Sequence, residues 1–278
     1  MFQQFYKPHP ALQPFVKEYH LLHLDFVNLP KTAAKPYPPR GEQCLYFYPR
    51  NTLTKVGKGS GIVDSSSHSI IAGQSLTRVN MSIPRDYIML KVAFNPSGLF
   101  RFLGVPLTHF TDIGIETEAV LGNEIKQVNE QLKNTEGYHN MIAVVEKFLL
   151  ERIKKVKFDI SSIDQVCFNI QNPNNNFSLD ALARQAYLSP RQFERKFVER
   201  IGVSPKLYAR IVRFQNAFKI KDKNPDLNWL QIAVNNGYTD YNHLVKDFKQ
   251  FTGVTPTILM SEHEGFEKLA EQCRFFTT

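Results

Sequence analysis

The sequence predicts an α+β protein with two domains: a β-barrel-like N-terminal domain with trailing helices, and an all-α domain after it. Three observations favour this class. Short apolar and aromatic runs separated by turn residues fill the first hundred positions. The apolar pattern then changes to a helical period. A phrase that begins at Ser189 recurs at Thr239. A length of 278 residues suits two domains of ordinary size.

The N-terminal strands are predicted from three runs, "CLYFYP", "SIIAGQ" and "YIMLKVAF", at residues 44–49, 69–74 and 87–94. Segments such as "YPPRGEQ" and "RNTLTKVGKGSG" lie between strands and have the composition of turns. Many short strands with such spacers are typical of a compact β-barrel or sandwich.

Helices are predicted from Pro96 onward, at residues 96–105, 118–133 and 138–157. In the last of these, residues 141, 144, 145 and 149 form one apolar face. The basic stretch "RIKKVK" then indicates a domain boundary. We therefore expect a first domain at residues 1–156, a second at 157–260, and a weakly specified helical tail at 261–278.

The first copy of the repeated phrase predicts two helices joined by the short turn "YLS". Ser178 and Ser189 are suitable N-caps, and a proline follows the second of them. Gly202 is suited to end the second helix. The apolar faces are predicted from spacing, and they consist of Leu179, Leu182, Ala183 and Ala186 on the first helix and Phe193 and Phe197 on the second.

The second copy follows the same plan. Phe197, Gly202 and Pro205 recur 51 positions later, whereas Ala183 recurs 50 positions later as Ala233, so one extra residue lies in or near the second turn. Gly237 permits a tight turn, and either Thr239 or Asp240 is expected to cap the helix that follows. The expected inward side chains are Trp229, Ile232 and Ala233, then Leu244, Phe248 and Phe251.

Each copy is a helix–turn–helix motif, whose second helix can enter the major groove of DNA. Outward side chains there can reach base edges: arginine can donate to guanine and glutamine to adenine, and glutamate can accept from cytosine. A long helix is predicted between the copies, at residues 204–221, with a single buried stripe formed by Leu207, Ile211, Phe214 and Phe218. It can hold the two motifs at a fixed separation. Arg210 and Arg213 on this helix are expected either to meet phosphates or to be exposed to solvent.

These residues resemble the DNA-binding domain of AraC/XylS-type transcription regulators. The resemblance covers roughly residues 162–259 and rests on both motifs, their order, their separation and the endings "GVSP" and "GVTP". It implies a cytoplasmic regulator of transcription, often an activator that contacts RNA polymerase. "GEQCLYFY", "IAGQ" and "VAFNPSGLFRFLGVP" are similar to a β-rich domain found upstream of this module, which implies sensing or dimerisation. The expected DNA-binding residues are Arg191, Gln192, Glu194 and Arg195, then Tyr241, Asn242, His243 and Lys246.

The predicted partners are double-stranded DNA, RNA polymerase, a small-molecule effector and a second copy of the chain. The net charge is +8, and residues 177–260 contain thirteen lysine and arginine residues against seven acidic ones, which favours a polyanionic partner. The three distant cysteines, the missing signal-peptide pattern and the absence of a long apolar run predict a cytoplasmic protein without membrane spans.

The chain is not expected to be an enzyme or to hold a cofactor, because it contains no catalytic or phosphate-loop motif. An alternative keeps ligand binding or chemistry in the N-terminal domain and uses the helical domain for protein contacts. His20 and His23 lack an evident third ligand, so we expect structural or surface histidines and no metal. Cys44 is expected in the core. Tyr46 and Tyr48 share one face, which either packs in the core or lines a pocket.

Overall fold

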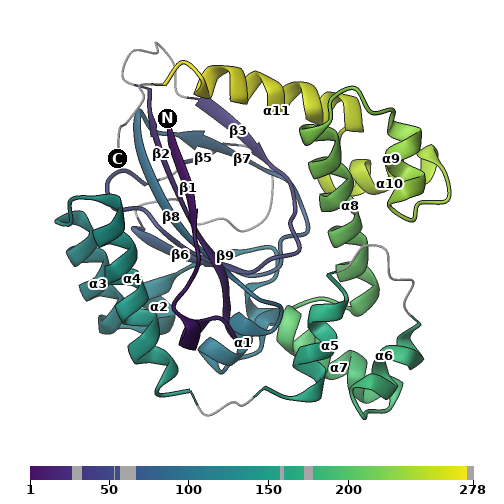
Figure 1. Cartoon of the computed structure of the whole chain (residues 1–278), viewed down its shortest axis with the longest axis horizontal. Coiled ribbons are helices and arrows are strands. Elements are labelled where there is room, and N and C mark those ends of the chain that lie inside the picture. Colours follow the sequence, from purple (N-terminus) through teal and green to yellow (C-terminus); the bar gives the residue numbers. More distant parts are fainter. Residues whose placement is uncertain (27–32, 53, 57–66, 157–159, 172–177, 274–278) are drawn as a thin grey trace.

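The computed structural model describes residues 1–26, 33–52, 54–56, 67–156, 160–171 and 178–273. Strands dominate the N-terminal part, as predicted (Figure 1). They are β1 (Phe2–Tyr6), β2 (Val16–Asp25), β3 (Ala33–Tyr37), β4 (Cys44–Phe47), β5 (Thr54–Val56), β6 (Ser69–Ala72), β7 (Val79–Ile83), β8 (Asp86–Phe94) and β9 (Gly114–Glu116).

Most of the helices follow the strands in the chain, but a short 3-10 turn, η1 (Pro10–Leu12), lies between β1 and β2, and two further helices precede β9. Those of the N-terminal part are α1 (Gly98–Leu103), the 3-10 helix η2 (Leu107–Phe110), α2 (Thr117–Leu121), α3 (Asn123–Lys133) and α4 (Tyr138–Ile153). Those that follow are α5 (Ser162–Asn169), α6 (Leu179–Gln185), α7 (Pro190–Ile201), α8 (Pro205–Lys223), α9 (Trp229–Asn235), α10 (Tyr241–Thr252) and α11 (Pro256–Ala270). The helix expected at 118–133 is divided at Gly122, which has a φ of +63°.

The strands form two sheets, with the orders β1-β2-β8-β4-β6-β9 and β3-β7-β5. All pairs are antiparallel, and β2 pairs with β8 along nearly its whole length. The predicted α+β class is confirmed. The expected barrel-like closure is only loosely met, because neither sheet closes on itself among the described residues. An open pair of sheets leaves room between them for a cavity.

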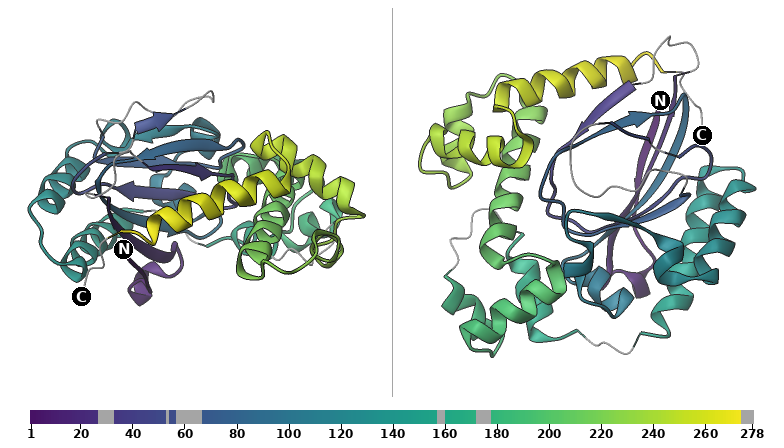
Figure 2. Two further views of the ribbon diagram at one scale, coloured as in Figure 1. Left: turned by 90° about the horizontal axis from the view of Figure 1, so that it is seen from above. Right: turned by 180° about the vertical axis from the view of Figure 1, so that it is seen from behind.

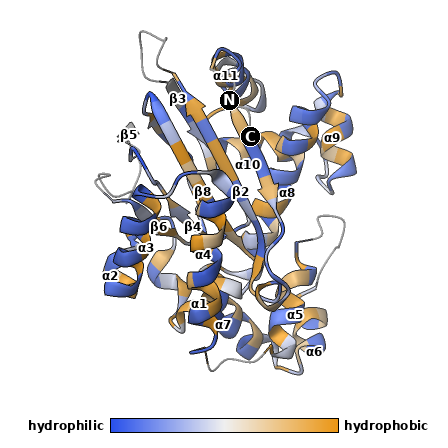
Figure 3. Cartoon of the chain, turned by 60° about the vertical axis from the view of Figure 1, so that its left-hand side comes forward, coloured by the Kyte–Doolittle hydropathy of each residue, from blue (hydrophilic) through white to orange (hydrophobic). Residues whose placement is uncertain are grey.

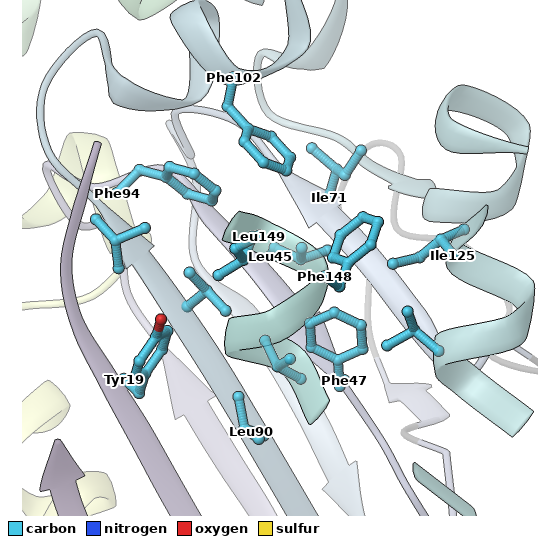
Figure 4. Close-up of a cluster of buried hydrophobic side chains, with 14 of the residues drawn as sticks. Tyr19, Leu45, Phe47, Ile71, Leu90, Phe94, Phe102, Ile125, Phe148 and Leu149 are labelled. Carbon is cyan, nitrogen blue, oxygen red and sulfur yellow. The ribbon is translucent and has the colours of Figure 1, made fainter. Parts of the chain in front are cut away.

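The main core lies between the six-stranded sheet and helices α1–α4 (Figure 4). Tyr19, Phe47 and Phe94 point from the strands toward Phe102 and Phe148 of the helices, and all five are buried. Burying each such aromatic side chain stabilises the fold by roughly 1.5–3 kcal/mol. This core holds the six-stranded sheet against α1–α4. Loops of the same domain extend from the sheet toward the C-terminal helices.

The C-terminal helices form two small cores, one at each end of α8 (Figures 1 and 2). Ile211, Phe214 and Phe218 of α8 are buried, which confirms the predicted stripe of the long helix. Hydrophilic and hydrophobic residues alternate around α6 and α7, as expected of helices that pack by one face (Figure 3). Among the described residues, no helix has both the length and the apolar character needed to cross a membrane.

Helix α11 runs through the boundary expected between residues 260 and 261. It extends from the second small core across β3 of the N-terminal part (Figure 1). Phe266 and Ala270 are buried beside strand residues such as Leu24 and Met89. The last helix therefore packs against both the N-terminal strands and the second small core.

Candidate nucleic-acid interface

The first candidate reading helix is α7, and its start is fixed by a capping box. The Ser189 hydroxyl accepts the backbone N–H of Gln192, while the Gln192 side-chain oxygen accepts the backbone N–H and the hydroxyl of Ser189. Pro190 occupies the first helical position. Phe193 and Phe197 anchor the opposite face, since both are fully buried. The sequence predicted the Ser189 cap, the place of Pro190 and the buried phenylalanines, but not the return bonds from Gln192.

The polar face of α7 is exposed in its N-terminal half. All four expected reading residues of this helix, Arg191, Gln192, Glu194 and Arg195, lie in solvent and line one open depression with Ser189. The capping contact uses the Gln192 side-chain oxygen, while its NH2 group has two hydrogens that can donate. The N-terminal half of a recognition helix is the part that contacts bases.

The second candidate reading helix is α10. Asp240, rather than Thr239, caps it by accepting the backbone N–H of His243 at 2.8 Å. Tyr241 and Lys246 are exposed, as is Asn242. The buried stripe consists of Leu244, Phe248 and Phe251, as predicted.

His243 differs from the other expected reading residues because it is half-buried. Its ring packs edge-on against the ring of Tyr238, with centroids 5.2 Å apart. Its Nδ1 lies 3.5 Å from the Thr239 hydroxyl. The structure thus brings Tyr241, Asn242 and Lys246 to the surface and packs the ring of His243 against the turn before α10.

The two turns show where the extra residue lies. Tyr187 and Gly237, 50 positions apart, both adopt the left-handed backbone conformation, with φ of +55° and +72°. The caps Ser189 and Asp240 are 51 positions apart. Thr239 is therefore the extra residue, in the turn where sequence comparison placed it. The helix before the first turn differs in one detail, since Leu179 is 38% exposed instead of inward.

Arg210 and Arg213 take part in an ion-pair network with Asp247 of α10, which the sequence did not predict. Asp247 is 1% exposed and accepts from Arg210 at 2.6 Å, while a guanidinium nitrogen of Arg213 lies 3.7 Å from its other oxygen. Arg213 also donates to the carbonyl of Gly237 and lies over the ring of Tyr238. Both arginines therefore hold α10 against α8, and their contact with phosphate stays a prediction.

The two helix–turn–helix units lie at opposite ends of α8 (Figure 1). A helix of 19 residues rises about 28 Å. Successive major-groove segments on one face of DNA are about 34 Å apart. Both units are on the side of the molecule away from α3 and α4 (Figures 1 and 2). This arrangement suits two reading helices on one duplex.

The sequence of the C-terminal helices is similar to that of known proteins. A family model described as a helix-turn-helix domain matches residues 182–261. HTH-type transcriptional regulator MtrA of Neisseria gonorrhoeae is 29% identical over 87 residues, and an uncharacterized HTH-type transcriptional regulator of Haemophilus influenzae is 34% identical over 89 residues. Residues 182–261 match the helix–turn–helix domain of AraC-type regulators.

The resemblance predicted from the sequence is thereby confirmed. The matches cover 31% and 32% of this chain, and the chain spans 29% of the length of each of these relatives. A second model, described as a domain of unknown function (DUF6597), matches residues 4–116. Among solved structures, two of ToxT from Vibrio cholerae are similar at 14% identity, with TM-scores of 0.48 and 0.46; they cover 87% and 88% of this chain and 97% of each ToxT chain.

The domain before the AraC-type helices contains a cavity between its two sheets. The cavity volume, as the space open to the centres of water-sized spheres, is about 90 Å³. The lining is mostly apolar and comes from β3, β4, β6 and β7, from loop residues in the ranges 40–42, 73–77 and 112–113, and from the start of β9. Tyr46 and Tyr48 line it with nearly parallel rings, while Phe47 points into the main core. The alternation predicted for these aromatic residues is confirmed.

Charged groups lie along one wall of the cavity. Glu42 pairs with Lys91 at 2.8 Å and lies 3.7 Å from Arg40, whose guanidinium stacks 4.7 Å from the ring of Tyr37. Burial alone would raise the pKa of Glu42, but Lys91 and Arg40 lower it to about 2. The Tyr37 and Tyr46 hydroxyls are 3.0 Å apart. The cavity thus combines an apolar body with a small ionic and phenolic wall, a composition typical of ligand sites.

The remaining candidates have structural roles. His20 and His23 lie on β2; the ring nitrogens of His23 contact the Tyr138 hydroxyl at 2.8 Å and Asp86 at 3.0 Å. In the described part of the chain, no cluster of three or more side chains suited to a metal occurs. Cys44 is buried, and burial raises the pKa of its thiol to about 12, as befits a core residue.

Proposed function

We propose that the protein is a sequence-specific regulator of transcription that reads two successive major-groove segments with α7 and α10. One observation carries the proposal: two capped helices of identical length, 51 residues apart, expose their N-terminal halves at the two ends of a helix about 28 Å long. Lysine and arginine contacts to phosphate supply affinity that depends on salt, and the exposed side chains supply discrimination.

The proposed base contacts come from Arg191, Gln192, Glu194 and Arg195 in the first unit. Tyr241, Asn242 and Lys246 contribute in the second, and His243 acts there by orienting the turn. The test is selection of bound sites from a random DNA pool by the full chain. The proposal expects a site with two separate blocks of preferred bases. Recovery of sequences without any common block would contradict it.

A second candidate function is effector binding in the cavity between the sheets. Its apolar lining and its wall of Arg40 and Glu42 support a small, largely apolar ligand with a polar group. Calorimetry with a panel of small amphipathic compounds tests this function. Ala72 lines the cavity, so Ala72→Phe is expected to abolish binding of any compound found while DNA binding is retained. Equal binding to the variant would contradict the site.

The proposal has three further parts. The protein activates transcription through contact with RNA polymerase, it forms a homodimer, and its two domains meet near residue 156. Sedimentation of the full chain with and without DNA measures the oligomeric state. The alternative, in which the helical domain serves protein contacts, is distinguished by retention on a nucleic-acid column with elution by salt. A protein that passes through the column at low salt supports the alternative.

A further inference from the structure

The C-terminal end of α7 is held by the N-terminal domain. The Thr111 hydroxyl donates to the carbonyl of Gly202, the C-cap of α7, at 2.9 Å. Gly202 has a φ of +95°, and a Cβ there would lie 2.6 Å from the Thr111 hydroxyl oxygen and 3.0 Å from the Leu107 carbonyl oxygen. Nearby, the Arg200 guanidinium lies 4.8 Å from the ring centre of Phe100. Such close backbone approach leaves little freedom for α7 to shift.

The C-terminal end of α10 is held by the same domain at a different loop. The backbone N–H of Arg78 donates to the carbonyl of Phe251 at 2.9 Å. The side chain of Arg78 pairs with Glu262 of α11 at 2.6 Å and is largely buried. Both reading helices therefore rest their C-terminal ends on the N-terminal domain and direct their N-terminal ends outward.

The two holding loops are bonded to each other. Asp112, next to Thr111, accepts the backbone N–H groups of Leu76 and Thr77 at 2.8 and 3.0 Å, and also the Thr77 hydroxyl. Its own N–H donates to the carbonyl of Gln74 at 2.9 Å. Asp112 has a φ of +56°, a conformation that an aspartate keeps when surrounding contacts over-determine it.

Leu76 connects this bonded unit to both helix–turn–helix cores. Its side chain packs against the core of the first unit and against the core of the second. Leu207 of α8 also packs against both cores. Long helices such as α8 can curve, so a second contact point beside the helix restrains movement of one unit relative to the other.

We propose that residues 74–78 together with Thr111 and Asp112, hereafter the brace, set the spacing between α7 and α10. The N-terminal domain thereby determines which separation of half-sites the protein reads. This inference rests on the proposed DNA binding. It does not depend on an occupant of the cavity, although Ser75, Thr77 and Asp112 also line that cavity.

The experiment measures affinity of the full chain for a series of selected sites in which the two blocks are moved apart or together by one and two base pairs. One inserted pair rotates the second block by about 34° and moves it about 3.4 Å. The wild type is expected to prefer one spacing by about tenfold or more. Leu76→Ala removes the side chain that packs against both cores, and it is expected to reduce that preference below about threefold. The affinity for DNA that carries only one of the two blocks is expected to stay unchanged.

Two further variants make the result decisive. Leu150→Ala removes a half-buried leucine of α4, far from the brace, and is expected to keep the spacing preference. Thr111→Val keeps the shape of the side chain and removes the hydrogen bond to Gly202, so it tests the brace without a cavity if Leu76→Ala unfolds. Unchanged preference in both brace variants, or tighter binding to every spacing, overturns the inference. Absence of specific binding by the wild type overturns the proposed function instead.

Discussion

Arg195 is the side chain whose proposed base contact is most directly testable. It is exposed on α7 and flanked by the buried Phe193 and Phe197, which hold the helix in place. Arg195→Ala is expected to weaken binding to the selected site by roughly 1–3 kcal/mol if the guanidinium makes a bidentate guanine contact. Titrations by fluorescence anisotropy measure the loss. Arg85→Ala, at an exposed position away from both units, is the matched control.

Binding to random DNA separates the two possible roles of Arg195. A base contact predicts a loss confined to the selected site and relaxed preference at one base pair. An equal loss on random DNA would mean that the arginine contacts only phosphate.

His20 predicts a dependence of stability on pH. Burial, together with the nearby charges of Lys91, Arg40 and Lys35, lowers the pKa of this imidazole to about 3, against the opposing effect of Glu42. The folded-state pKa is below the unfolded value near 6.5, so the folded state resists protonation that the unfolded state accepts. The stabilisation is present above pH 6.5 and is lost as pH falls toward 3.

The expected result is a free energy of unfolding that decreases by at most about 1 kcal/mol per pH unit below pH 6.5, after allowance for the partial exposure of the ring. Urea unfolding at pH 7.5, 6.0 and 5.0 measures it. His20→Gln is expected to reduce the slope, with the remainder due to His23, whose pKa burial also lowers. A slope unaffected by this substitution would show that His20 is solvated in the native state.

At the scale of elements, the first turn contains a backbone position that favours glycine. Tyr187 has a φ of +55°, and its side chain is 89% exposed, whereas the equivalent position of the second turn is Gly237. Tyr187→Gly is expected to raise the free energy of unfolding by up to about 1 kcal/mol, because the left-handed conformation costs a side-chain-bearing residue more than it costs glycine. Thermal unfolding measures the change.

Tyr187→Ala is the control for this turn. It removes the exposed ring but keeps a Cβ, so it is expected to leave stability nearly unchanged. Equal stabilisation by both variants would assign the effect to loss of the aromatic ring rather than to the backbone.

The elements that the sequence predicted are those with local signals. Caps at Ser178 and Ser189, the glycine ends at Gly202 and Gly253, and the buried stripe of α8 follow from residue type and spacing alone. The capping box explains why Gln192 is both a reading candidate and a structural residue. The division of one predicted helix at Gly122 follows from its left-handed φ, which a periodic apolar pattern does not reveal.

At the scale of the whole molecule, the features that the sequence did not predict depend on contacts between distant positions. Asp247 is 37 residues from Arg210, and Arg78 is over 170 residues from Phe251, so no local pattern links them. Placement of α11 on β3 likewise depends on burial of Phe266 against strands near the other end of the chain. The open arrangement of the sheets, instead of a closed barrel, also depends on such long-range pairing.

The most direct test of two adjacent reading helices is a footprint of the full chain on a selected site, at low salt and at a concentration where one chain binds. The structure predicts protection of two major-groove segments about one helical turn apart, on one face of the duplex. Protection of a single segment, unchanged when Lys246 and Asn242 of α10 are both replaced by alanine, would contradict the account.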